Sequence, residues 1–443
     1  MKRRAVMIVA GTRPEAIKLA PVFWWLDKLG VDYVFVWSGQ HYDYEMSRVF
    51  FEQLHLPEPV AFLNVGIQAS DVSEQVGILI HKIATYAKQL QPDIIYALGD
   101  TNTTLAAALA STYVGRPFIH DEAGVRSFDM AMLEEVNRRV ADAVADFRLA
   151  PTKLALLNLL YEGASSTTIK LVGSTAIDTL LYILSSNMLR EDVFNELEVE
   201  PGNYILFTLH RRENLTAERL RSITALLTEV AKRKPDVKIV FPIHPHTSKR
   251  MKELKLEKVL KKFNNIIMTK PLGYLEFITL LKKANVVITD SGGVQEEAYI
   301  LGKKTITLRD TTEWFETVVT GYNLLVRLDQ VQGLAMTIIT HMEKPDMPPP
   351  NLSTCPLGDG KAGMRIARTL KGLLERGLKK RREEGFKLPQ LTASRIDSSI
   401  CFSQNGLPAL EKDHIVCVTR TSIEYDKLRN FIEVNWAEID KEK

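Results

Sequence analysis

Acidic side chains cluster in the first third of the chain, where apolar runs end. Asp100 ends the run DIIYALGD, and Glu122 lies near the end of the run PFIHDEAG. A third acid, Glu134, stands at the start of the segment LEEVNRR. Carboxylates held close together have pKa values that move apart, which provides one proton donor and one proton acceptor. These three acids are therefore candidates for proton transfer.

Basic side chains stand at similar positions in both halves of the chain. Arg13 and Lys18 follow the first apolar run, AVMIVAG, at the start of a predicted helix, where backbone N–H groups already favour anions. His210 ends the run YILFTLH, and His244 ends the run KIVFPIH. The alternative for Arg13 and Lys18 is a capping turn with solvated charges. The HPH motif that begins at His244 could hold a metal, but its proline and the lack of a clear partner carboxylate lead us to predict no metal.

The segment DSGGVQEE follows the run VVIT and opens a predicted helix. Ser291, Gly292 and Gly293 would let the backbone approach a phosphate, with free N–H donors at the helix N-terminus. Glu297, one turn further on, could accept hydrogen bonds from a ribose diol. The alternative is an ordinary turn between a strand and a helix. No GxGxxG and no GxxxxGK motif occurs, which argues against NAD and against nucleoside triphosphate hydrolysis.

The residues around Glu134 are given structural roles. Glu135 and Arg139 have i,i+4 spacing on a predicted helix, and we interpret them as a surface ion pair of little energetic value. Gly124 gives the chain room to turn. Arg126 is predicted to position this loop or the ligand.

The elements that must position these residues are short apolar strands alternating with amphipathic helices, which is typical of parallel sheets covered on both faces. In such sheets ligands bind at the carboxyl ends of the strands. The pattern runs twice and predicts an α/β chain with two Rossmann-like domains in tandem. The predicted strands are 5–11, 32–39, 93–100, 117–124 and 147–152, and then 204–210, 238–244, 266–271, 286–290, 305–308 and 323–326.

The domains are predicted at residues 1–175, for the carboxylates, and 176–362, for the phosphate-binding turn. A proline-rich break precedes a predicted helix at 363–384. The tail at 385–443 is weakly patterned and receives no predicted role.

Composition excludes several classes of protein. The chain has 443 residues, 45% of them hydrophobic, and a net charge of +3, so no broad basic field indicates a nucleic-acid partner. The apolar run near the N-terminus is too short to span a membrane. The three cysteines, with no CxxC spacing, indicate neither a disulfide framework nor a structural zinc site, and they fit the reducing cytoplasm.

Several of these motifs, taken together, resemble the non-hydrolysing UDP-N-acetylglucosamine 2-epimerases. The matching segments, in order from about Ala5 to about Leu378, are GTRPEAIKLAP, GQHY, GDTNTTLAAALA, EAGVRSFD with EEVNR, TLHRREN, and TDSGGVQEEA with LRDTTE. The resemblance implies the glycosyltransferase-B fold, in which two Rossmann-like domains face each other across a cleft and a C-terminal helix returns to the first domain. It also implies a cytoplasmic homodimer that uses no cofactor and no metal.

The implied reaction interconverts UDP-N-acetylglucosamine and UDP-N-acetylmannosamine, through elimination of UDP to 2-acetamidoglucal and re-addition, for surface polysaccharide or glycan synthesis. By this resemblance the catalytic residues are Asp100, Glu122, Glu134 and His210. The implied substrate-binding residues are Arg13, Lys18, Arg126, His244, Ser291, Gly292, Gly293 and Glu297.

The chain departs from the family pattern beside the nucleotide site. Trp314 and Phe315 stand where the family usually has arginine and proline, and the proline common before the position of Glu134 is missing. Three alternatives stay open: a retaining glycosyltransferase of the same fold, an epimerase for a related sugar such as a UDP-diacetamido-uronic acid, and a nucleotide-sugar-binding regulator without catalysis. The intact acids and His210 argue against the last.

Overall fold

The computed structural model describes residues 5–39, 51–328, 331–380, 393–396, 399–402, 416–419 and 431–441. The chain forms two compact units, which are described one at a time. Unit 1 contains residues 1–179 and 352–443, and unit 2 contains residues 180–351. Gln40, His41 and Tyr42 of the GQHY motif lie outside the described residues.

Unit 1 is built on a parallel sheet with the strand order β3-β2-β1-β4-β5-β6-β7. Its strands are β1 (Val6–Ala10), β2 (Tyr33–Trp37), β3 (Ala61–Phe62), β4 (Ile94–Leu98), β5 (Phe118–Asp121), β6 (Phe147–Ala150) and β7 (Ile169–Leu171). Because β1, β4 and β5 are parallel neighbours, their carboxyl ends meet at one edge of the sheet. The two short strands β3 and β7 were not predicted.

Unit 2 repeats the same topology with the order β10-β9-β8-β11-β12-β13, and all neighbouring pairs are parallel. Its strands are β8 (Tyr204–Phe207), β9 (Lys238–Pro242), β10 (Ile266–Thr269), β11 (Val286–Thr289), β12 (Thr305–Thr307) and β13 (Asn323–Leu325). All six strands were predicted. Both orders are Rossmann orders, which confirms the predicted α/β fold with two Rossmann-like domains.

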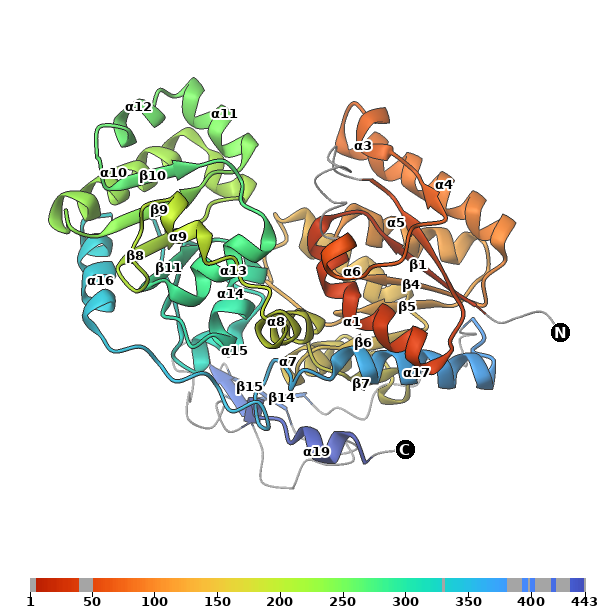
Figure 1. Ribbon diagram of the computed structural model, residues 1–443. Helices are drawn as coiled ribbons and strands as arrows, with labels where there is room; N and C mark the ends of the chain where they lie inside the picture. The colour runs from red at the N-terminus through yellow and green to blue at the C-terminus, as the bar shows by residue number, and fades with distance from the viewer. Residues whose placement is uncertain are drawn as a thin grey trace. The chain divides into compact units, whose positions relative to one another are not determined.

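Helices connect the strands of each sheet (Figure 1). Those that lie wholly in unit 1 are α1 (Arg13–Leu29), α3 (Val65–Gln68), α4 (Val72–Leu90), α5 (Asn102–Tyr113), α6 (Leu133–Val144), α7 (Lys153–Tyr161), α17 (Ala362–Arg376) and α19 (Trp436–Ile439), with the 3-10 turn η1 (Ser166–Thr168). Helix α8 (Thr175–Ser185) carries the chain from unit 1 into unit 2. The helices of unit 2 are α9 (Asp192–Glu196), α10 (Ala217–Arg233), α11 (Pro245–Glu253), α12 (Glu257–Leu260), α13 (Tyr274–Lys283), α14 (Gly292–Ile300), α15 (Phe315–Val319) and α16 (Val331–Glu343), with the 3-10 turn η2 (Arg212–Leu215).

After unit 2 the chain returns to unit 1 as α17, which packs against α1 (Figure 1). Gly363 makes this close approach possible, because a Cβ atom there would lie 2.6 Å from the backbone of Pro21. Two backbone N–H groups at the start of α17 donate to Asp178 of α8, at 3.1 Å from Ala362 and 2.8 Å from Gly363. The predicted returning helix is therefore confirmed.

Part of the C-terminal tail also has regular structure. Three antiparallel strands, β14 (Ala393–Ile396), β15 (Ser399–Phe402) and β16 (Val416–Thr419), pair in that order. Further on, Trp436 is buried, and its indole N–H donates to the carbonyl of Cys355 at 2.8 Å. The guanidinium of Arg365 lies 4.5 Å from the centre of the Trp436 ring. The end of the tail is thus anchored on unit 1, which the sequence did not predict.

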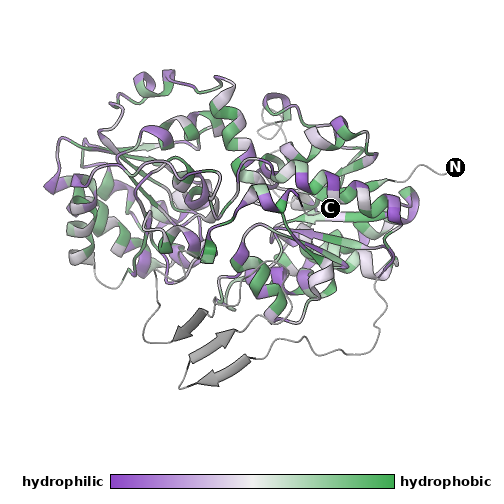
Figure 2. Ribbon diagram, turned by 90° about the horizontal axis from the view of Figure 1, so that it is seen from below, coloured by the Kyte–Doolittle hydropathy of each residue, from purple (hydrophilic) through white to green (hydrophobic). Residues whose placement is uncertain are grey.

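The strands and the inner faces of the helices supply the buried cores of both units. Figure 2 shows the parallel strands coloured mainly as hydrophobic, whereas the helices carry both kinds of residue. Within the described part of the chain, none of the helices combines the length and the apolar character needed to cross a bilayer.

Candidate active site

Glu122 follows β5 in a strained backbone conformation. Its φ of +61° lies in the left-handed region, which costs a residue other than glycine about 1–3 kcal/mol and is typical of functional sites. Its backbone N–H donates to Asp121 Oδ1 at 2.8 Å. Its Oε1 accepts a hydrogen bond from Lys18 Nζ on α1 at 2.5 Å, and both side chains are mostly buried. The structure therefore joins two of the predicted residues in one ion pair.

Asp100 follows β4, the strand next to β5, and its carboxylate is paired with the guanidinium of Arg138 on α6. Asn137, on the same helix, donates from Nδ2 to the backbone carbonyl of Asp100 at 2.9 Å. The Asp100 side chain is still 29% exposed, so a ligand can reach it. Helix α6 thus fixes the position of Asp100, and the sequence had not assigned this role to Arg138.

Glu134 and Glu135 have different environments in the first turn of α6. Glu134 is half-buried and makes no hydrogen bond or ion pair with another described residue. Glu135 is fully buried and accepts hydrogen bonds from the Ser127 backbone at 2.8 Å and from Arg138 at 3.2 Å, while Arg139 lies 3.0 Å away. The predicted i,i+4 pair of Glu135 and Arg139 is therefore present, but its predicted place on the surface is wrong, because the loop that contains Ser127 covers this carboxylate.

Arg126 is buried, and its guanidinium donates hydrogen bonds to two carboxylates and one backbone carbonyl. It binds Asp142 at 2.7 Å, Glu162 at 2.6 and 3.0 Å, and the carbonyl of Val125 at 2.7 Å. The structure gives Arg126 a structural role in this loop, which is one of the two roles predicted for it, and the contact with ligand stays a prediction.

The sequence also missed a buried pair beneath the acids. His120 Nδ1 lies 2.6 Å from Asp142 Oδ1, and its Nε2 lies 2.8 Å from the carbonyl of Gly99. Burial lowers the pKa of His120, but the attraction of Asp142 and these hydrogen bonds outweigh it and raise the pKa above its ordinary value. The sequence signal for this pair is the run HDEAG, which places a histidine inside a buried strand, where it needs a polar partner.

Glu15 links the turns that follow β1 and β4. Its carboxylate accepts hydrogen bonds from the backbone of Gly11 at 3.0 Å and of Thr12 at 2.8 Å, and from the hydroxyl of Thr101 at 2.8 Å. Burial raises the pKa of Glu15 to about 7, although these hydrogen bonds oppose the shift. Glu15 thereby holds the turn that carries Arg13, which is half-buried at the first position of α1.

In unit 2, His210 stands at the carboxyl end of β8 beside a buried carboxylate. Asp290, which follows β11, accepts hydrogen bonds from the backbone of His210 at 2.9 Å, the backbone of Arg211 at 2.9 Å and the side chain of Asn214 at 3.0 Å. The His210 Nδ1 atom lies 3.8 Å from Asp290 Oδ1, and the His210 side chain is 42% exposed. His244, at the N-cap of α11, has its ring centre 5.7 Å from that of His210. The two predicted histidines therefore lie together.

The predicted phosphate-binding turn forms as expected at the N-terminus of α14. Ser291 is the N-cap residue, and Gly292 and Gly293 are the first two helical residues. A Cβ atom at Gly293 would meet nothing within 4 Å, so the space over this turn is open to a ligand. A Cβ atom at Gly292 would lie 3.2 Å from Trp314 Nε1. Trp314, one of the two departures from the family pattern, therefore lines this turn.

Two further carboxylates of unit 2 are held by hydrogen bonds. Glu297 of α14 accepts a hydrogen bond from the Tyr274 hydroxyl at 2.7 Å and is mostly buried. Glu313, next to Trp314, accepts hydrogen bonds from Arg211 at 3.0 Å and from Arg309 at 3.1 Å. These contacts fix the loops around the N-terminus of α14.

Comparison with known proteins identifies the family. The family model described as UDP-N-acetylglucosamine 2-epimerase matches residues 26–371. The chain belongs to this family. A relative from Methanocaldococcus jannaschii, named UDP-N-acetylglucosamine 2-epimerase, is 41% identical over 367 residues, which cover 82% of this chain and 98% of the relative.

Two other proteins bear on the choice of substrate. A crystal structure of the M. jannaschii UDP-GlcNAc 2-epimerase, solved with UDP-GlcNAc and UDP, has a TM-score of 0.77 and 40% identity, and the match covers 83% of this chain and 99% of that one. A Pseudomonas aeruginosa protein named UDP-2,3-diacetamido-2,3-dideoxy-D-glucuronate 2-epimerase is 37% identical over 325 residues, which cover 72% of this chain and 88% of the relative. The family therefore includes epimerases for more than one UDP sugar.

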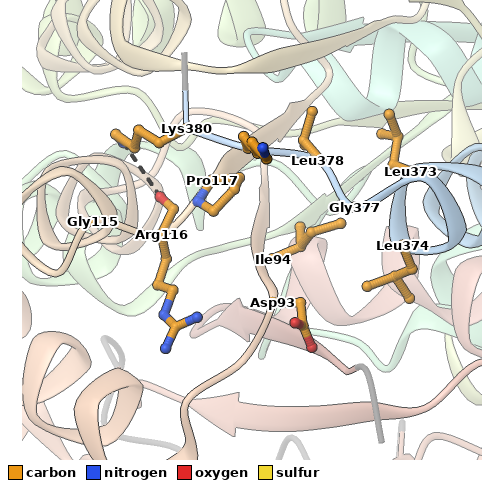
Figure 3. A pocket seen from close by; sticks show the side chains of 11 residues that line it. Asp93, Ile94, Gly115, Arg116, Pro117, Leu373, Leu374, Gly377, Leu378 and Lys380 are labelled. Atoms are coloured by element: carbon orange, nitrogen blue, oxygen red, sulfur yellow. Dashed lines mark hydrogen bonds between the residues drawn. The ribbon is translucent and has the colours of Figure 1, made fainter. Parts of the chain in front are cut away.

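Among the residues that the structure describes, no cluster of histidine, cysteine and acidic side chains is arranged to hold a metal. A hollow of about 300 Å³ in unit 1 lies beside the amino ends of β4 and β5 and the end of α17, where Lys380 donates to the carbonyl of Arg116 at 3.3 Å (Figure 3). Because the predicted acids follow the carboxyl ends of the same strands, this hollow is separate from them.

Proposed function

We propose that the chain interconverts UDP-N-acetylglucosamine and UDP-N-acetylmannosamine by eliminating UDP and adding it back. The observation that carries the proposal is Glu122, a carboxylate on a strained residue at the end of β5, paired with Lys18 at 2.5 Å. Asp100 ends the adjacent strand, so two acids stand at the edge of the sheet where α/β proteins bind ligands. Family membership supports the same reaction.

The reaction breaks the C1–O bond to UDP and the C2–H bond, and it forms a C1–C2 double bond. The electron pair of the C1–O bond leaves with UDP, and a carboxylate takes the C2 proton. In the second step a carboxylic acid delivers a proton to the other face of C2, and an oxygen of UDP forms a new bond to C1 as the double bond is lost. We propose that Asp100, Glu122 and Glu134 share these two proton transfers, a role suited to carboxylates in unlike environments.

The proposal assigns the nucleotide to unit 2. The backbone N–H groups of Ser291, Gly292 and Gly293 would bind the diphosphate, since helix N-termini favour phosphate. Glu297 would accept hydrogen bonds from the ribose. His210 and His244 would stabilise the charge that develops on departing UDP, and Arg13 and Lys18 of unit 1 would assist them. Arg126 is not among the proposed ligand contacts, because its guanidinium already donates to Asp142, to Glu162 and to the carbonyl of Val125.

A second candidate substrate is a UDP-diacetamido-uronic acid. It is favoured by the 37% identity to the P. aeruginosa epimerase. The chemistry at C1 and C2 would be the same for both sugars, so the two candidates differ only in the groups at C3 and C6.

The experiment is turnover in deuterated water, with each sugar in turn and without added metal or NAD. We expect deuterium at C2 of both UDP-N-acetylhexosamine epimers and traces of free UDP. Retention of the original C2 hydrogen would overturn the mechanism, and faster exchange into the uronate would select the second candidate. Transfer of the sugar to an acceptor without epimerisation would instead indicate a glycosyltransferase. We further propose a homodimer that works in the cytoplasm, which sedimentation of the purified protein and cell fractionation would test.

A further inference from the structure

One buried carboxylate of α6, Asp142, contacts the chain on both sides of Glu122. Asp142 Oδ1 lies 2.6 Å from Nδ1 of His120, two residues before Glu122. Asp142 Oδ2 accepts a hydrogen bond at 3.0 Å from the backbone N–H of Gly124, two residues after it. Gly124 sits in the left-handed region, and a Cβ atom there would lie 2.1 Å from the carbonyl of Ala155. This turn therefore has one tightly packed conformation, and Asp142 holds both of its ends.

His120 extends the contact to the neighbouring strand. Its Nε2 faces the carbonyl oxygen of Gly99 at 2.8 Å, and a carbonyl oxygen only accepts hydrogen bonds. Its Nδ1 faces the Asp142 carboxylate, so both contacts favour the protonated ring, in which both nitrogens donate. Gly99 immediately precedes Asp100, and a Cβ atom at Gly99 would lie 3.4 Å from Glu122 Oε2. The His120–Asp142 pair thus joins the turns that carry Asp100 and Glu122.

The pair keeps its charges because the surrounding side chains balance them. Burial alone would raise the pKa of Asp142, but His120 and Arg126 outweigh it and lower the pKa to about 2. The second carboxylate on Arg126 belongs to Glu162, at 2.6 Å. Asp142 is therefore ionised throughout the pH range in which the enzyme would work.

We propose that Asp142, acting through His120 and Gly124, is a positioning residue that sets where the Asp100 and Glu122 carboxylates meet C2 of the sugar. The inference rests on the proposed epimerase function. Two carboxylates that serve opposite faces of one carbon must be placed relative to each other, and an error of about 1 Å in such placement can cost about 100-fold in rate. Asp142 has no contact with substrate in this role.

The chain provides a matched control for Asp142. Asp146 is also buried, two residues after the end of α6, and its Oδ2 accepts a hydrogen bond at 2.8 Å from the backbone N–H of Phe118. Phe118 is the first residue of β5, so this contact lies at the opposite end of the strand from Glu122. Asp142→Asn and Asp146→Asn both remove one buried carboxylate that contacts β5, and only the first touches the turns that carry Asp100 and Glu122.

The experiment uses the full-length chain with UDP-N-acetylglucosamine that carries hydrogen or deuterium at C2. For Asp142→Asn we expect kcat to fall about 100-fold, with KM unchanged within about threefold. We also expect a larger C2 isotope effect and more 2-acetamidoglucal released for each epimer formed, because proton transfer becomes slower. The last two quantities are ratios for each turnover, so a fraction of unfolded protein does not change them. Asp146→Asn is expected to keep both ratios at the wild-type values.

A second variant covers the case in which Asp142→Asn does not fold. His120→Phe keeps a ring of similar size and removes both donors, while Arg126 still balances Asp142. It is expected to change the two ratios in the same direction. If the C2 isotope effect and the release of 2-acetamidoglucal for each epimer stay at the wild-type values in Asp142→Asn, the positioning role is refuted. If only His120→Phe folds, wild-type values in that variant refute it. If the wild-type chain itself does not epimerise the sugar, the proposed function fails instead.

Discussion

Lys18 Nζ lies 2.5 Å from Glu122 Oε1, and this pair links the first helix of unit 1 to the strained turn after β5. In this pair the Lys18 ammonium group donates and the Glu122 carboxylate accepts. The same ammonium group could stay beside the reacting carbon while the carboxylate takes up a proton. The pair therefore suits an acid that must accept a proton in one direction of the reaction.

Glu122→Gln tests this role directly. Glutamine keeps the shape of the side chain and the same backbone preference but cannot accept the proton, so we expect deuterium exchange at C2 to fall about 10²–10⁴-fold. The affinity for UDP, measured by calorimetry, should stay within about twofold, because the proposed diphosphate and ribose contacts are in unit 2 and the variant keeps Lys18 itself. Loss of UDP binding together with loss of exchange would give Glu122 a structural role.

Arg126→Met separates the structural role of this arginine from the one predicted by sequence. Its guanidinium joins Asp142 and Glu162. After its removal Asp142 keeps His120 and Glu162 keeps Arg139 as charged partners, so we expect the free energy of unfolding to fall by about 1.5–3 kcal/mol. Urea unfolding followed by tryptophan fluorescence would report mainly on unit 1, which contains Trp24, Trp25, Trp37 and Trp436. The affinity for UDP should be unchanged. If the affinity for UDP fell tenfold while the stability stayed at the wild-type value, Arg126 would instead be assigned a contact with the ligand.

Glu15 makes stability depend on pH. Burial raises its pKa from 4.5 to about 7, so the folded state binds a proton that the unfolded state has released between those two values. Stability is therefore expected to fall as pH rises from about 4.5 to 7, by up to about 3 kcal/mol for this group. In Glu15→Gln, the free energy of unfolding measured with urea should decline less between pH 5 and pH 8 than in the wild type. The exposed Glu58→Gln serves as control, and an unchanged slope in Glu15→Gln would contradict the assignment.

The strands were predictable because buried parallel strands have continuous apolar runs, as in Val6–Ala10 and Val286–Thr289. The two-residue strand Ala61–Phe62 is too short to leave such a pattern. The roles of single charged residues were harder to predict. Helical spacing shows that Glu135 and Arg139 share a face, but it does not show that another loop covers that face. The partners of Asp142 come from other elements, so no motif around it signals its contacts.

Asp290 supports the loop that carries His210, and Asp290→Asn tests how strongly. The carboxylate accepts hydrogen bonds from the backbone of His210 and Arg211 and from the side chain of Asn214. Burial raises the pKa of Asp290, but the hydrogen bond and charge of His210, with the other donors, outweigh it and lower the pKa below its ordinary value. Asparagine replaces one acceptor oxygen with a donor that would face these N–H groups. Lost charged hydrogen bonds are worth about 1.5–3 kcal/mol each.

We therefore expect Asp290→Asn to lower kcat about 10–100-fold, because His210 is no longer held beside the leaving diphosphate. Since the pKa of Asp290 is lowered, the group stays ionised at neutral and basic pH, and its contribution is lost only as the pH falls through that lowered pKa. The loss of activity should therefore be the same at pH 6 and at pH 9. Steady-state kinetics at both pH values, with the exposed Asp236→Asn as control for a lost charge in unit 2, would measure it. Wild-type kcat in Asp290→Asn would show that the His210 loop keeps its position without this carboxylate.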